Sequence, residues 1–89
     1  MKVELRGSIK VSLGIDNVEV EMPPGGVPLS RVLEAVAETN PRATPYLRRE
    51  GSGQAVLRVV HNGTVVPTGD DPLVQPEDSL LLMHAVAGG

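Results

Sequence analysis

Between residues 29 and 37 the apolar side chains recur with the period of an α-helix, whereas on both sides of this segment they alternate as in β-strands. Pro28 suits the first turn of such a helix, and Asn40-Pro41 ends it near Thr39. The apolar stripe has the spacing i, i+3, i+4, i+7 and i+8: Leu29, Val32, Leu33, Val36 and Ala37. One such helix covers one face of one sheet, so the pattern predicts an α+β fold.

Two strands are expected before this helix. The first is broken near Gly7, and its apolar residues alternate with polar ones: Val3, Leu5, Ile9 and Val11. The second covers residues 18–22, where glutamates separate the apolar residues. The segment 23–26, Pro-Pro-Gly-Gly, ends it with a turn.

After the helix we expect strands over residues 55–61, 64–66 and 80–86. The Asn62-Gly63 dipeptide between the first two is the strongest hairpin signal in the chain. Residues 41–54 form a connection, in which Tyr46-Leu47 caps one end of the core. With the last strand at its centre, a mixed sheet of four to five strands covered by one main helix is the β-grasp, the ubiquitin-like fold.

Composition limits the classes of function. The 89 residues make one domain, residues 1–89, with a small core. A net charge of −3 and a single aromatic residue, Tyr46, argue against nucleic acid as a partner. The chain has no cysteine, which excludes a thiol nucleophile, a persulfide on this chain and disulfides. We see no signal peptide and no membrane-spanning run, so we expect a cytoplasmic protein that is monomeric when free.

The sequence ends in Gly88-Gly89. Glycine lacks a Cβ, so two terminal glycines can enter a channel too narrow for any other residue. They present an unhindered carboxylate, which is a poor electrophile until it is activated, for example as an anhydride with AMP. We therefore expect a flexible tail over residues 85–89, with Gly89 as the reactive end and Ala85, Val86, Ala87 and Gly88 in a partner's channel.

Together these segments resemble the ThiS/MoaD sulfur-carrier family of ubiquitin-like proteins. The resemblance is carried by residues 61–66 around Asn-Gly, by Asp71-Pro72-Leu73, by the acidic turn 77–80 and by the tail 85–89. The chain departs from the family pattern at two points, with Glu77 where the family usually has glycine and His84-Ala85 where the MoaD branch commonly has two prolines. In length it resembles MoaD and the cysteine-forming carriers more than the thiamin carriers.

The resemblance implies that an adenylyltransferase of the ubiquitin-activating type uses ATP to convert the Gly89 carboxylate to an acyl adenylate. A sulfur donor enzyme then displaces AMP and leaves a thiocarboxylate, from which a synthase takes the sulfur. The chain would be a protein co-substrate and not an enzyme, with no bound cofactor. This agrees with a sequence that has no phosphate-binding Gly-rich loop and no catalytic triad.

The last strand predicts a docking surface. Leu80 and Leu82 point to one face and Leu81 and Met83 to the other, and only one face lies under the helix. We expect Leu81 and Met83 to form an exposed apolar patch with Val60 and Val65, of the kind that marks an interface. By resemblance, Met83 and Val65 match positions that the family uses to dock its enzymes.

Two further clusters have ordinary explanations. His61 and His84 would lie near each other only if their strands are neighbours, and without a carboxylate they predict no metal site. The acidic residues Asp70, Asp71, Glu77 and Asp78 are typical of solvated turns, with a docking rim for a basic partner as the alternative.

Besides the sulfur carrier, two other functions fit the sequence. One is a protein modifier whose Gly89 is joined to lysines of target proteins, and the other is a non-covalent interaction domain that does not need Gly89. The sequence leaves open the pathway that would receive the sulfur: molybdopterin, thiamin, cysteine, tRNA thiolation or a specialised metabolite.

Overall fold

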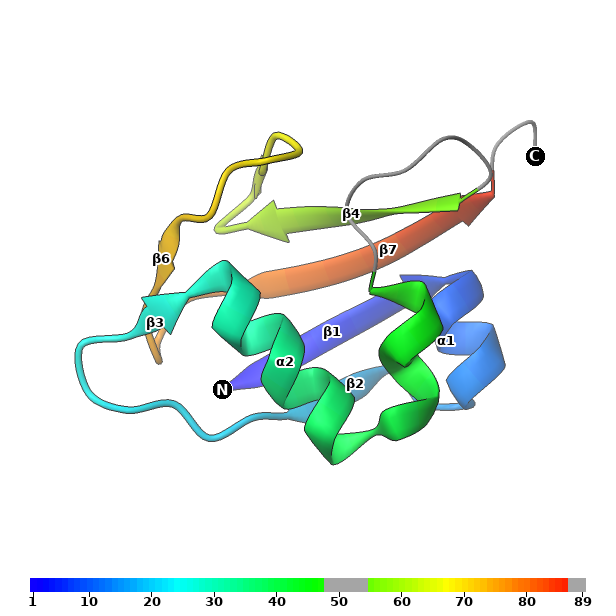
Figure 1. The fold of residues 1–89 in the computed structure, drawn as a ribbon, viewed down its shortest axis with the longest axis horizontal. Helices are drawn as coiled ribbons and strands as arrows, with labels where there is room; N and C mark the ends of the chain where they lie inside the picture. The colour runs from blue at the N-terminus through cyan, green and yellow to red at the C-terminus, as the bar shows by residue number, and fades with distance from the viewer. Residues whose placement is uncertain (48–54, 87–89) are drawn as a thin grey trace.

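A computed structural model describes residues 1–47 and 55–86, with the backbone alone for 55, 56 and 84–86. A five-stranded mixed sheet has the strand order β2-β1-β7-β4-β5. Helix α2 (Leu29–Thr39) lies across one face of this sheet (Figure 1). The strands have these bounds: β1 Lys2–Gly7, β2 Asn17–Glu19, β4 Ala55–His61, β5 Thr64–Val65 and β7 Leu80–Val86.

The strand that comes last in the chain lies at the centre of the sheet. β7 pairs in parallel with β1 on one side and antiparallel with β4 on the other. Strand β2 pairs with β1 at one edge and β5 with β4 at the other. The predicted β-grasp, with a mixed sheet under one main helix, is confirmed.

Helix α2 has the bounds that the apolar stripe predicted. Leu29, Val32, Leu33 and Val36 are buried, and Ala37 at the edge of the stripe is half-buried. Pro28 lies one residue before the helix instead of in its first turn, with φ −59° and ψ 151°. At the other end, the Asn40 N–H donates to the Val36 carbonyl, and the short 3-10 helix η1 (Pro41–Tyr46) follows.

A second sheet joins the beginning of α2 to the turns near the end of the chain. Strands β3 (Val27–Pro28) and β6 (Leu73–Val74) pair antiparallel. Neither was predicted, because two residues are too few to show a strand period. Gly26 precedes this pair at φ +80°, where an added Cβ would lie 2.3 Å from the Val74 carbonyl oxygen. Only glycine allows the backbone at residue 26 to lie this close to the backbone of β6.

The structure corrects the first predicted strand. Residues 2–7 form β1, but Ser8–Leu13 form helix α1 instead of continuing the strand. Gly7, at φ 74° and ψ −147°, turns the chain, and Ile9 is then buried while Val11, two residues on, is 80% exposed. In a strand Ile9 and Val11 would share one face, so their opposite burial excludes a strand here. Gly14 ends the helix in a left-handed conformation, and its N–H donates to the Lys10 carbonyl.

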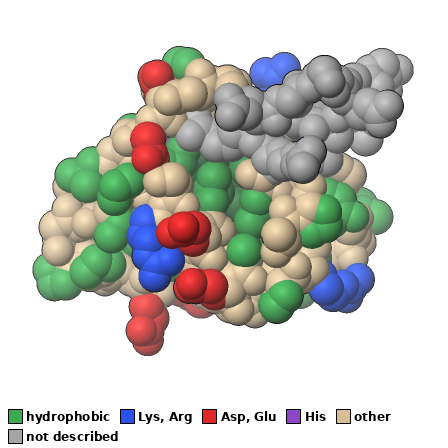
Figure 2. All heavy atoms as spheres, in the orientation of Figure 1, with side chains coloured by type: hydrophobic (Ala, Val, Ile, Leu, Met, Phe, Trp, Pro, Cys, Tyr) green, Lys and Arg blue, Asp and Glu red, His purple; other side chains and the backbone are tan. Residues whose placement is uncertain are grey.

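The core lies between α2 and the sheet and consists of aliphatic residues. Tyr46 and Leu47 pack against it, as expected, and the Tyr46 hydroxyl donates to Ser12 Oγ at 2.7 Å. On the outer side of α2, Arg31 pairs with Glu34 and Glu38. Acidic and basic side chains lie close together on the face shown in Figure 2. The buried residues are Val3, Leu5, Ile9, Val18, Val20, Leu29, Val32, Leu33, Val36, Ala43, Leu57, Val59, Val74, Leu80 and Leu82.

The predicted hairpin is confirmed at Asn62-Gly63. Both residues have positive φ, 51° and 82°, as the tight turn between twisted antiparallel strands requires. Asn62 is also bonded to Ser79 twice, because its N–H donates to the Ser79 carbonyl and its Oδ1 accepts from the Ser79 N–H. The hairpin is thereby fixed to the start of β7. In the described part of the chain, no helix has the length and apolar character needed to cross a membrane.

Candidate functional site

The chain leaves the sheet through β7. This strand continues to Val86, so Ala85 and Val86 are paired with Val56 and Ala55 of β4. A flexible tail was expected from residue 85, but Ala85 and Val86 belong to this strand instead. Ala87, Gly88 and Gly89 lie outside the described residues.

Four apolar residues lie together on the face of the sheet opposite α2, and we call them the sheet patch: Val60, Val65, Leu81 and Met83. The strand register brings them together, because Val60 is paired with Leu81 on one side and with Val65 on the other. Met83 lies two residues beyond Leu81 on β7 and therefore points to the same face. The predicted grouping of these residues is confirmed.

Burial confirms which face of β7 is which. Leu80 and Leu82 are 2% and 0% exposed under α2, whereas Leu81 and Met83 are half-buried. Val65 on the edge strand is 55% exposed. Of the four residues expected to form an exposed patch, only Val65 is exposed, because Val60, Leu81 and Met83 are half-buried. The use of the sheet patch in docking stays a prediction.

Charged residues border the sheet patch, and the sequence pattern alone did not show them. Glu4 is paired in register with Leu81, and both Arg6 of β1 and Arg58 of β4 are paired with Met83. Arg6 and Glu4 form an ion pair of 3.5 Å between exposed side chains. These charged residues lie beside the sheet patch only because β1 and β4 pair with β7. Their position could therefore not be predicted without the strand register.

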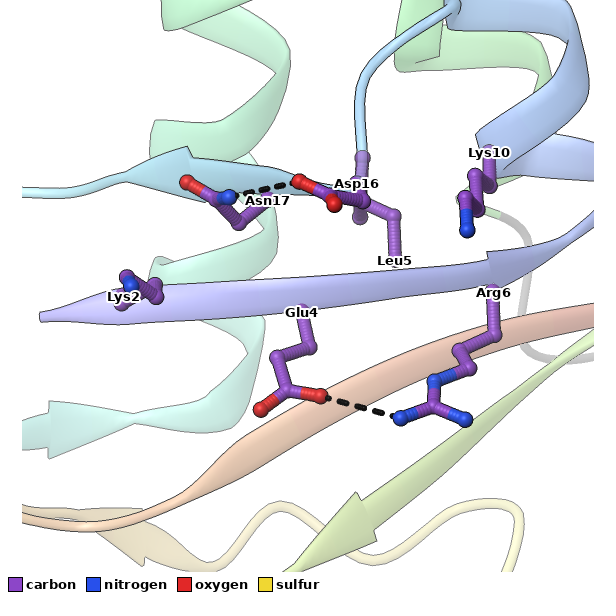
Figure 3. Close-up of a pocket in the computed structure, with 7 residues that line it drawn as sticks. All are labelled: Lys2, Glu4, Leu5, Arg6, Lys10, Asp16 and Asn17. Carbon is purple, nitrogen blue, oxygen red and sulfur yellow. Dashed lines mark hydrogen bonds and ion pairs between the residues drawn. The ribbon is translucent and has the colours of Figure 1, made fainter.

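A shallow hollow lies beside these charges, between β1, β2 and α1 (Figure 3). In Figure 3 the Lys10 side chain points from α1 toward β1, and the Glu4–Arg6 pair lies on the other side of that strand. The hollow depends on α1, a segment whose sequence predicted a strand. It is lined by Lys2, Glu4, Leu5, Arg6, Lys10, Asp16 and Asn17.

The two histidines do not come together. His61 is paired with Leu80 and His84 with Leu57, four positions away along β4. This register separates their backbones by about 13 Å at about 3.3 Å per residue. Among residues 1–47 and 55–86, no three side chains of metal-binding type lie together.

His61 contacts Asp78 instead, at 2.7 Å between Nε2 and Oδ2. The same carboxylate oxygen accepts a hydrogen bond of 2.8 Å from the Gln75 N–H. Hydrogen bonds from the Gln75 backbone, then His61 and then Asn62 lower the pKa of Asp78 from 3.8 to about 2. Asp78 therefore holds the turn before β7 against the hairpin.

The other three residues of the acidic cluster differ in their surroundings. The Asp71 carboxylate accepts hydrogen bonds of 2.7 Å from both the N–H and the hydroxyl of Ser30, in the first turn of α2. Asp70 and Glu77 are exposed, as a solvated turn predicts. Asp71 and Asp78 thus have structural roles that the sequence did not reveal, because both partners lie in distant segments.

Comparison with known proteins identifies a matching family and solved structures that have the same fold. The family model described as "ThiS family" matches residues 8–89. No curated protein sequence matches the chain. SAMP1 from Haloferax volcanii has a TM-score of 0.75 at 22% identity, over 100% of this chain and 98% of that one.

Two further solved structures have the same fold. H. volcanii small archaeal modifier protein 1 has a TM-score of 0.68 at 20% identity over 93% of each chain. A putative molybdopterin converting factor, subunit 1, from Pyrococcus furiosus has a TM-score of 0.64 at 16% identity over 92% of each chain. At these identities the likeness concerns the fold.

Proposed function

Because this chain belongs to the ThiS family, whose members are small sulfur carriers rather than catalysts, we propose that it carries sulfur on Gly89. In the proposed cycle the Gly89 carboxylate attacks the α-phosphate of ATP, which releases pyrophosphate and forms an acyl adenylate. Sulfide supplied by the donor enzyme displaces AMP and gives the thiocarboxylate directly. A persulfide of the donor enzyme instead displaces AMP to form an acyl disulfide, and a second thiol of the donor then attacks its S–S bond, which releases the thiocarboxylate and leaves a disulfide on the donor. The resulting thiocarboxylate supplies sulfur to a synthase.

The observation that carries this proposal is the extent of the family match, which runs from residue 8 through Gly88 and Gly89. The match therefore includes both glycines on which the chemistry depends. The sheet supports it, because β7 lies between β1 and β4 and is paired on both sides as far as Gly7 and Ala55. A strand held in this way fixes the place from which the chain leads to Gly89.

The sheet patch provides the docking surface in this proposal. Met83 is the member of the sheet patch nearest the end of β7, three residues or about 10 Å before Val86, whereas Val60, Val65 and Leu81 lie nearer the start of the strand. A partner that covers the sheet patch is therefore bound to the strand that leads to Gly89. Binding at a fixed distance from the reacting group is how a protein substrate is positioned for chemistry. Ala87 and Gly88 would then lie in the channel of the adenylyltransferase, with Gly89 at its nucleotide.

A protein modifier is the second candidate. The H. volcanii structure named for a small archaeal modifier protein has the same fold, and attachment to a lysine would begin with the same activated Gly89. The two functions differ in the acceptor, which is a sulfur nucleophile in one and a lysine amine in the other. Covalent adducts of a tagged chain in cells, lost on deletion of Gly89, would favour the modifier.

Mass spectrometry of the intact protein tests the sulfur carrier directly. The chain is incubated with ATP, sulfide and the adenylyltransferase of its own organism. We expect the mass gain that corresponds to one carboxylate oxygen replaced by sulfur, placed on Gly89 by fragmentation. A chain that is never adenylated or thiolated under these conditions would contradict the proposal, and a chain ending at Gly88 is the control.

A further inference from the structure

Two arginines enclose one residue of the sheet patch. Arg6 of β1 and Arg58 of β4 are both paired in register with Met83 of β7, one from each side. Paired residues in a sheet point to the same face, so both guanidinium groups lie on the open face beside Met83. Both side chains are exposed. We call Arg6 and Arg58 the arginine pair.

Among residues 1–47 and 55–86, Glu4 is the one acidic side chain that forms an ion pair with the arginine pair. Arg58 has no ion-pair partner among the residues that the structure describes. Arg6 contacts Glu4 at 3.5 Å, with 63% and 54% of the two side chains exposed, and an exposed pair of this kind contributes little to stability. The neighbouring hollow is lined by the basic residues Lys2, Arg6 and Lys10 and the acidic residues Glu4 and Asp16, so positive charge is in slight excess there (Figure 3).

The rest of the molecule has the opposite character. The chain has a net charge of −3, and the outer side of α2 carries Glu34 and Glu38 around a single arginine, Arg31. A cationic rim beside an apolar centre, on an otherwise acidic protein, orients the approach of a partner by its charge. Arginine binds a carboxylate with two parallel hydrogen bonds, which also fixes the geometry of the contact.

From this arrangement, and resting on the proposed function, we infer that Arg6 and Arg58 bind carboxylates of the adenylyltransferase on both sides of the Met83 contact. The partner's surface then has an apolar centre for the sheet patch and acidic residues at its rim. Met83 lies three residues before Val86, the last paired residue of β7, so this contact determines which face of the sheet is bound and holds the strand that leads to the tail.

The test compares Arg58→Glu and Arg6→Glu with Arg31→Glu, which changes the net charge equally on the opposite side of the molecule. Direct binding to the organism's own adenylyltransferase is measured by titration calorimetry at 50 mM and 500 mM NaCl. ATP–pyrophosphate exchange is measured in parallel, and thermal melts show that each variant is folded. Arg58→Gln removes the charge without reversing it.

At low salt we expect Arg58→Glu and Arg6→Glu to weaken binding about tenfold or more and to raise the KM for the carrier with kcat unchanged. Arg58→Gln should have a smaller effect, and high salt should reduce all these differences because it screens exposed charges. Arg31→Glu should bind like the wild type.

Binding of Arg58→Glu and Arg6→Glu equal to that of Arg31→Glu would overturn the inference, as would a loss that high salt leaves unchanged. Failure of the wild type to bind at all would overturn it too. Normal charge-dependent binding without exchange would support the arginine contacts and contradict the proposed function alone.

Discussion

At the scale of single residues, neighbouring side chains of β7 lie on opposite faces of the sheet and have different roles. Leu82 is fully buried under α2, and Leu81 and Met83 on either side of it belong to the sheet patch. Because a strand has a side-chain period of two, one residue stabilises the fold and the next is free to bind. Substitutions at adjacent positions therefore separate folding from docking.

We expect Leu82→Ala to lower the free energy of unfolding by about 2–5 kcal/mol, because it leaves a cavity in the core. Leu81→Ala removes the same atoms from a half-buried position and should cost clearly less. Urea denaturation of both variants provides the comparison. Equal losses would show that the two faces of β7 are not distinct in this way.

Met83→Asp and Val65→Asp should fold like the wild type and bind the adenylyltransferase more weakly. Both residues lie on the open face, and a charge at the apolar centre of an interface is left without a partner on binding. Circular dichroism checks the fold and calorimetry the affinity. If Met83→Asp unfolds the protein, the residue belongs to the core and the sheet patch is wrongly assigned.

At the scale of elements, side chains from distant segments supply hydrogen bonds that a helix or turn cannot make by itself. Helix α2 begins after Pro28, which offers no side-chain cap, and Asp71 bonds to Ser30 in its place. We expect Asp71→Ala to lower the free energy of unfolding by about 0.5–2 kcal/mol, the usual range for the loss of an N-terminal cap. Thermal melts would measure this loss, with exposed Glu77→Ala as the control.

Asp78 makes the connection between β7 and the hairpin sensitive to acid. Its pKa is about 2 in the folded protein and 3.8 as the ordinary value, so the ionised form favours folding. This contribution is fully present above pH 3.8 and is lost as the pH falls through about 2. Melting temperatures between pH 6 and 2 should show Asp78→Asn less stable than the wild type at pH 6, with the gap closing toward pH 2.

A gap between Asp78→Asn and the wild type that stays constant down to pH 2 would contradict this role of the Asp78 charge. Glu77→Gln removes a charge from the adjacent exposed position and is the matched control. Its melting temperature should follow that of the wild type over the whole range.

Elements with a clear period were predictable, and short ones were not. The stripe from Leu29 onward predicted α2 with its bounds, and the β4 and β7 strands follow the alternating segments. Helix α1 was not predicted, because apolar residues at 9 and 11 also suit a strand. The positive φ of Gly7 turns the chain out of β1, and the helix begins at the next residue. Strands β3 and β6 have two residues each, too few for any period.

At the scale of the whole molecule, the order of elements was enough to predict the β-grasp, because one helix and one central strand leave few ways to cover a sheet. The sheet patch was predictable for the same reason, since it depends on period and pairing. Its charged surroundings were not, because Arg6 and Arg58 meet at Met83 only through a register between three distant strands.

The proposed function depends on activation of the Gly89 carboxylate by ATP, and exchange of pyrophosphate into ATP measures that step directly. The full chain is compared with a chain ending at Gly88, using the adenylyltransferase of the same organism. Removing Gly89 withdraws the carboxylate by about 3.3–3.6 Å along an extended chain, and errors of about 1 Å already impair such chemistry. We predict exchange with the full chain and none with the shortened chain, although both fold and bind. Equal rates for the two chains would contradict the account.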